Sequence, residues 1–104
     1  MAVEVPEVDE VRRLLEKLDE RVLIARLDSF VALNEGLETK KGKEFIEVSI
    51  LGFLEGILTV MKEKYPHNGE VVDLYSMVVK RRRELDELFR KPRIPYLEEN
   101  PPTP

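Results

Sequence analysis

The residues best suited to bind an anion lie in one basic segment near the carboxyl end of the chain. Residues 80–93 contain seven lysines and arginines and three acidic residues. The candidate contacts are Lys80, Arg81, Arg82, Arg83, Arg90 and Lys91. Because arginine can form paired hydrogen bonds with phosphate or carboxylate, the segment predicts an anion-binding or nucleic-acid-binding surface. The alternative is a helix face on which the arginines pair with Glu84, Asp86 and Glu87, or with an acidic residue of the first predicted helix.

Other residue types that carry chemistry are scarce. The chain has no cysteine and a single histidine, His67, so thiolate metal sites, cysteine nucleophiles and disulfides are excluded. His67 follows Pro66 and is interpreted as a surface turn residue. The serines have no histidine or lysine at the spacing of a nucleophile and its base. We therefore expect no catalytic residue, no metal ion and no cofactor.

A row of small residues interrupts the most apolar part of the chain. Ser49, Gly52 and Gly56 follow one another at helical spacing among large aliphatic residues. Glycine destabilises a helix interior by about 1 kcal/mol relative to alanine, so two of them suggest that another backbone packs closely against this helix. We interpret the three residues as a helix-packing or dimer interface. Glu47, in the same helix, would have a raised pKa if it were buried without an arginine partner.

Apolar periodicity predicts three helices, over about residues 8–35, 44–64 and 70–90. Apolar residues recur every three or four positions through the first segment and at nearly every position of the second. Asn34 to Gly36 and Tyr65 to Gly69 are typical of chain reversals. We predict a single all-α domain over residues 1–93, followed by a proline-rich extended tail over residues 94–104. Ile94, Tyr96 and Leu97 in that tail are a candidate contact with another protein.

The predicted helix lengths bear on assembly. A first helix of about 27 residues would span roughly 40 Å, while the other two would span roughly 30 Å. Its apolar stripe extends over the full length, so part of it would be exposed in a monomer. The sequence therefore predicts an antiparallel three-helix bundle with one long N-terminal helix, paired with a second copy as an intertwined or side-by-side homodimer.

Composition places the chain among soluble helical proteins. It has 104 residues, 42% of them hydrophobic and 37% charged, with a formal net charge of −4. The negative total disfavours indiscriminate binding to nucleic acid or anionic membranes, and the acidic start lacks the pattern of a secretory signal. We expect a cytoplasmic protein without a membrane span. Glutamine and cysteine are absent while charged residues are abundant, which is typical of thermophile proteins.

One family comparison arises from the first helix. Val11-Arg12, Leu15, Leu18-Asp19 and Val22-Leu23 resemble the opening of the all-helical chorismate mutases. The resemblance implies an intertwined helical dimer in which Arg12, Lys40 and Glu47 bind a dicarboxylate. Ser29 stands where that family has its second arginine of the first helix, and the acidic, arginine-containing motif of the second helix is missing.

Three functions are consistent with these observations. By elimination of catalytic groups, the favoured function is that of a small non-enzymatic helical interaction or assembly protein that acts as a homo-oligomer. The first alternative is a nucleic-acid-associated accessory protein that uses the basic segment 80–93. The second is an enzyme related to the helical chorismate mutases.

Overall fold

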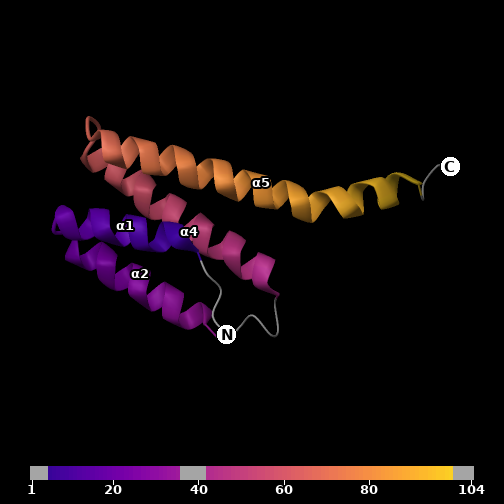
Figure 1. The fold of residues 1–104 in the computed structure, drawn as a ribbon, viewed down its shortest axis with the longest axis horizontal. Coiled ribbons are helices and arrows are strands. Elements are labelled where there is room, and N and C mark those ends of the chain that lie inside the picture. Colours follow the sequence, from indigo (N-terminus) through magenta and orange to yellow (C-terminus); the bar gives the residue numbers. More distant parts are fainter. Residues whose placement is uncertain (1–4, 36–41, 100–104) are drawn as a thin grey trace.

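The computed structural model describes residues 5–35 and 42–99, with side chains described as far as Leu88. Its helices are α1 (Pro6–Lys17), α2 (Arg21–Asn34), α4 (Lys43–Lys64) and α5 (Gly69–Glu99). The all-α class is confirmed, since no strand occurs in the described residues. α4 and α5 form a long hairpin, and α2 lies at the edge of the molecule farthest from α5 (Figure 1). α1 packs against α2, α4 and α5.

The first helix begins and ends with recognisable local signals. Pro6 opens α1, where its missing N–H would have no helical partner anyway, and Glu7 and Asp9 lie in the first turn. Val11, Leu14 and Leu15 form its buried face. After Leu18 the Asp19 backbone takes a φ of 58°, in the left-handed region. The Glu20 N–H then donates to the Leu15 carbonyl at 2.9 Å, and the Asp19 N–H donates to the Glu16 carbonyl at 3.1 Å.

This pair of hydrogen bonds is the Schellman arrangement that closes a helix on a left-handed residue. The predicted single helix over residues 8–35 is therefore wrong, because the chain turns at Leu18 to Glu20 and continues as α2. The three- and four-residue spacing of apolar residues continues across this turn, so the sequence pattern does not reveal where the helix ends. Leu15 before the turn is fully buried, whereas Val22 after it is 67% exposed, although both belong to the same sequence pattern.

Side chains hold α2 beside α1 and α4. The Arg12 guanidinium donates to both carboxylate oxygens of Asp28, at 3.0 and 2.9 Å, and so joins α1 to α2. At the turn, one carboxylate oxygen of Glu20 accepts a hydrogen bond from the Tyr65 hydroxyl at 2.6 Å and pairs with Lys64 at 2.7 Å. The turn between α1 and α2 is thus attached to the carboxyl end of α4.

α4 carries the centre of the core. Seven of its side chains are buried, namely Ile46, Ile50, Leu51, Leu54, Ile57, Leu58 and Met61. They pack against the buried faces of α1, α2 and α5, including Leu15, Leu27 and Val78. α4 ends at Lys64, just before Pro66, and the Asn68 side chain accepts a hydrogen bond from the Val71 N–H at 3.2 Å at the start of α5.

α5 extends beyond the predicted end of the third helix. The extended conformation predicted for residues 94–99 is wrong, because the helix continues to Glu99, while residues 100–104 lie outside the described part. Pro92 and Pro95 remove backbone donors and bend a helix without always ending it, and α5 curves in its last part (Figure 1). With 31 residues, α5 rather than the N-terminal helix is the longest element, and it overhangs α4.

The molecule is flat and elongated. Its principal extents are 57, 32 and 17 Å, and its radius of gyration is 16.5 Å. A compact chain of this length would have a radius of gyration of about 13 Å. The accessible surface is 7052 Å², whereas a compact monomer of this mass exposes roughly 6,000 Å². The shortest extent leaves room for about two layers of helices, so many helix faces meet solvent.

We predict that Asp19→Gly stabilises the protein and that Asp19→Ala destabilises it. Glycine adopts the left-handed conformation without the clash of a β-carbon, and aspartate tolerates that conformation better than alanine does. The difference in free energy of unfolding between the two variants should be about 1 kcal/mol. Chemical denaturation followed by circular dichroism measures it, and equal stability of the two variants would show that the turn is not held at this residue.

Candidate functional site

Arg81 lies between two carboxylates contributed by different helices. One guanidinium nitrogen, Nη1, donates to both oxygens of Glu7 on α1, at 2.8 and 2.6 Å. The other, Nη2, lies 3.5 Å from Glu47 on α4. Glu7 is only 8% exposed and is the buried acidic residue of the described part. Arg81 therefore joins α1, α4 and α5 within the protein.

Arg82 is also paired, on the neighbouring side of α5. Its Nε donates to Glu55 on α4 at 2.6 Å, and its Nη1 donates to Asp86 one turn further along α5 at 2.9 Å. The hydrogen bond that Arg82 donates to Glu55 is the main cause that raises the pKa of Arg82, so the guanidinium is firmly charged. Two of the predicted anion contacts thus have carboxylate partners in the same chain.

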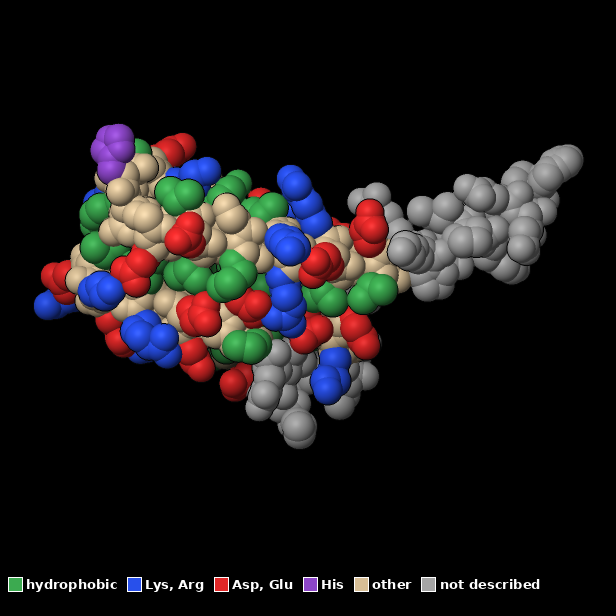
Figure 2. Space-filling model, turned by 45° about the horizontal axis from the view of Figure 1, so that its top comes forward, with side chains coloured by type: hydrophobic (Ala, Val, Ile, Leu, Met, Phe, Trp, Pro, Cys, Tyr) green, Lys and Arg blue, Asp and Glu red, His purple; other side chains and the backbone are tan. Residues whose placement is uncertain are grey.

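The remaining residues of the basic cluster are placed differently. Lys80 and Arg83 are exposed on α5, and neither forms an ion pair with another described residue. They line a shallow groove together with Glu84 and Glu87. Over the face shown in Figure 2, basic and acidic side chains are interspersed. The side chains of Arg90 and Lys91, and those of Ile94, Tyr96 and Leu97, lie outside the described part.

Ser49, Gly52 and Gly56 line an open groove between α4 and α5, together with Arg82 and its two acidic partners. A β-carbon added at Gly52 would meet the Cδ of Arg82 at 3.8 Å, an ordinary contact, and one added at Gly56 would meet nothing within 4 Å. No described backbone packs closely against the two glycines. Their predicted role in close packing within the bundle is therefore wrong, and a role between subunits stays a prediction.

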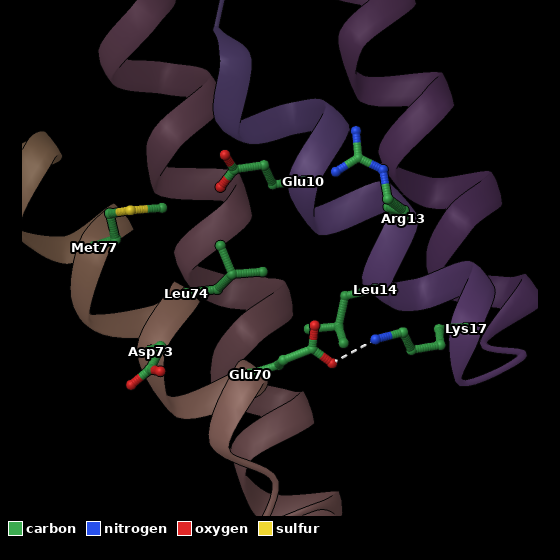
Figure 3. A pocket seen from close by; sticks show the side chains of 8 residues that line it. All are labelled: Glu10, Arg13, Leu14, Lys17, Glu70, Asp73, Leu74 and Met77. Carbon is green, nitrogen blue, oxygen red and sulfur yellow. Dashed lines mark hydrogen bonds and ion pairs between the residues drawn. The ribbon is translucent and has the colours of Figure 1, made fainter.

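A second groove lies between α1 and the start of α5 (Figure 3). It encloses about 290 Å³. Leu14, Leu74 and Met77 supply its apolar lining. Arg13 and Lys17 come from α1 and Glu70 and Asp73 from α5, and Lys17 pairs with Glu70 at 2.8 Å. Charges of both signs surround the groove, so it does not concentrate the single sign of charge that binds a small ion.

A largely apolar groove runs along the outer face of α2. It encloses about 400 Å³ and is lined by Val22, Ala25, Arg26, Ser29, Phe30, Leu33 and Phe53. Val22 and Leu33 are 67% and 74% exposed. Phe30 of α2 and Phe53 of α4 stack with their ring centroids 4.2 Å apart and form the border between this groove and the core.

The residues implied by the chorismate mutase resemblance do not form an open anion site. The Arg12 guanidinium is occupied by Asp28 and also bonds Glu16. Glu47 pairs with Arg81, and Lys40 lies outside the described part. In the side chains that the structure describes, no group of three histidine or acidic residues could hold a metal ion.

Sequence reasoning missed two features. Glu7 lies 74 residues before Arg81, and a charged residue in the first turn of a helix is ordinarily interpreted as a dipole contact. The outer face of α2 could have been recognised in the sequence. One set of residues recurs there at spacings of three and four, beside the separate stripe of Leu23 and Leu27, and consists of Val22, Ala25, Ser29 and Leu33. Two apolar stripes on one helix indicate contacts on two sides.

The fold and these surfaces define an all-helical protein with no described helix long and apolar enough to cross a membrane. The chain belongs to the family described as "Protein of unknown function (DUF3216)", whose model matches residues 8–99. Comparisons with curated proteins and with solved structures found no match.

We predict that Arg81→Met lowers the free energy of unfolding by about 1 to 3 kcal/mol, because it leaves the buried Glu7 carboxylate without its partner. Arg83→Met is the matched control, since Arg83 is exposed on the same helix and has no ion pair among the described residues. Its effect should stay within about 0.5 kcal/mol. Urea denaturation of both variants makes the comparison, and equal effects would contradict the structural role of Arg81.

We also predict a loss of stability in acid that depends on Glu20. Hydrogen bonds from Lys64 and Tyr65 lower the pKa of Glu20 in the folded protein. A carboxylate with a lowered folded pKa stabilises the protein above its unfolded pKa, and this contribution is lost as the pH falls through the folded pKa. Glu20→Gln should therefore flatten the decline in stability below about pH 5.

Glu63→Gln is the control for the acid experiment, because Glu63 is exposed on α4 and has no ion pair among the described side chains. Thermal melts of the wild type and both variants across the acidic range measure the effect. Parallel stability curves for the wild type and Glu20→Gln would show that this carboxylate does not contribute.

Proposed function

We propose that this protein is a non-enzymatic helical interaction protein that acts as a homo-oligomer. The observation that carries the proposal is the apolar groove on the outer face of α2, where Val22 and Leu33 are 67% and 74% exposed.

Exposed apolar side chains support an interaction role. Large hydrophobic residues are exposed on α2, α4 and α5, among them Val22, Leu33 and Leu88. Single exposed hydrophobic residues are common on monomers, but those of α2 line one continuous apolar groove. Contiguous apolar surface of this kind is typical of protein–protein interfaces.

The nucleic-acid alternative receives less support from the contacts. Arg81 and Arg82 are engaged with Glu7, Glu55 and Asp86, so they are not available to neutralise phosphates. Lys80 and Arg83 remain exposed beside Glu84 and Glu87. With a formal net charge of −4, the whole chain would also be repelled by a phosphate backbone.

The enzymatic alternative is weakened in a similar way. The side chains that would bind a dicarboxylate, Arg12 and Glu47, already have partners of opposite charge in other helices. A binding site made from them would require those ion pairs to break. We therefore retain self-association as the proposed function.

We predict that sedimentation equilibrium at micromolar concentration gives at least twice the chain mass of 12.1 kDa. An interface that covers the apolar groove of α2 should bind with at least about micromolar affinity. Moderate added salt should leave the association in place, because apolar contacts are not screened as charges are. A single species at 12.1 kDa across this concentration range would contradict the proposed function.

A further inference from the structure

The turn between α4 and α5 contains a peptide bond that is prone to chemical change. Asn68 ends this turn and directly precedes Gly69, the first residue of α5. The backbone nitrogen that follows an asparagine can attack the side-chain carboxamide and close a succinimide ring, and glycine favours this closure because it lacks the β-carbon that would crowd the ring. The surrounding protein leaves room for the ring, since a β-carbon placed at Gly69 would meet nothing within 4 Å.

The nitrogen that would attack is not held by another hydrogen bond. Gly69 opens α5, and the first N–H groups of a helix have no acceptor within the helix. Both hydrogen bonds that close the turn use other donors, since the Asn68 N–H donates to the Tyr65 carbonyl and the Val72 N–H donates to the Asn68 carbonyl, each at 3.1 Å. No carbonyl of the described residues accepts from the Gly69 N–H, and Gly69 is exposed. Its nitrogen is therefore free to react.

The carboxamide of Asn68 is already directed toward the first turn of α5. Its Oδ1 accepts a hydrogen bond from the Val71 N–H at 3.2 Å. Attack at Cγ moves negative charge onto Oδ1, and a backbone N–H that already donates to this oxygen stabilises that charge, as in the oxyanion holes of acyl-transfer enzymes. The hydrogen bond that caps α5 thus also favours the attack of the Gly69 nitrogen.

The other asparagines of the chain lack this combination. Asn34 precedes Glu35, whose N–H donates to two carbonyls of the preceding helical turn at 3.1 and 3.3 Å. The Asn34 side chain is itself held by a hydrogen bond from Nδ2 to a backbone carbonyl of α2 at 2.9 Å. Asn100 precedes Pro101, which has no N–H. The reaction should therefore be specific for Asn68.

We infer that Asn68 is a site of spontaneous deamidation in the folded protein. The Gly69 nitrogen forms a bond to Cγ of Asn68, the bond from Cγ to Nδ2 breaks, and ammonia leaves with the proton of the Gly69 nitrogen. Water then opens the succinimide. Addition of water at Cγ gives aspartate, whereas addition at the main-chain carbonyl carbon gives isoaspartate, in which the backbone runs through the former side chain. Either product adds one negative charge to the formal net charge of −4.

The two products should affect the hairpin of α4 and α5 differently. Aspartate keeps an oxygen that can accept from the Val71 N–H, and its charge is favourable at the amino end of a helix. Isoaspartate lengthens the backbone between the turn and α5, so the cap loses its register. Met61 and Val71, on the two sides of the turn, are both fully buried. The isoaspartyl form should therefore melt at a lower temperature than the aspartyl form.

The test incubates the full chain at mildly alkaline pH, in buffer and in urea. Isoelectric focusing measures the acidic form, peptide mass spectrometry locates the change, and an isoaspartyl methyltransferase detects isoaspartate. Gly69→Ala places a β-carbon beside the attacking nitrogen, where the structure has room for it. Asn68→Ser is the control, because serine also caps a helix but has no amide to lose. Circular dichroism establishes that both variants keep their helix content.

The expected result is an acidic form of the wild type that is modified at Asn68, formed in buffer at least as fast as in urea. Gly69→Ala should slow the reaction at least about tenfold, which corresponds to a barrier about 1.4 kcal/mol higher. Asn68→Ser should not form the acidic species. An intact Asn68, equal rates for the wild type and Gly69→Ala, or a reaction that proceeds only in urea would overturn the inference.

Discussion

Asp19 holds the backbone in the left-handed region between two helices, and the position of α2 depends on that one reversal. If the helix continued through Leu18, as its apolar spacing suggests, α2 would project away from the body instead of packing beside α1 and α4. Side-chain contacts then hold α2 in this position. Arg12 of α1 pairs with Asp28 in the middle of α2, and Glu20 at the start of α2 contacts Tyr65 and Lys64. Because α2 has the body of the protein on one side only, its other apolar side faces solvent.

The arginines of α5 act as connections within the fold. Arg81 contacts acidic residues of two other helices, and Arg82 contacts one on α4 and one on its own helix. These side chains are partly buried, so the pairs are screened less than surface pairs and their loss leaves desolvated carboxylates behind. A segment that has the composition of an anion site thereby becomes part of the packing between helices. The groove along α2, by contrast, is lined mostly by apolar side chains.

Much of the fold could be predicted from the sequence because its signals are local. The apolar density of residues 44–64, the proline after Lys64 and the asparagine that caps α5 each identify their element directly. The break at Asp19 could not be predicted in this way, since Schellman turns ordinarily carry glycine and the apolar spacing continues across it. The partners of Arg81 depend on how three helices pack, and residue spacing does not reveal contacts between residues 7 and 81. The candidate interface was predictable in principle, from the second apolar stripe of α2.

The central claim, that this chain self-associates through the apolar groove of α2, is tested most directly by cross-linking. The chain has no cysteine, so Ser29→Cys and Ser76→Cys each introduce a single thiol at an exposed helical serine, the first on α2 and the second on α5. A short bismaleimide links two thiols only when the helices that carry them are in close contact, at axis separations of about 8–10 Å. We expect Ser29→Cys to give a covalent dimer rapidly and Ser76→Cys to remain single. Equal rates for the two variants, or faster linkage through residue 76, would contradict the claim.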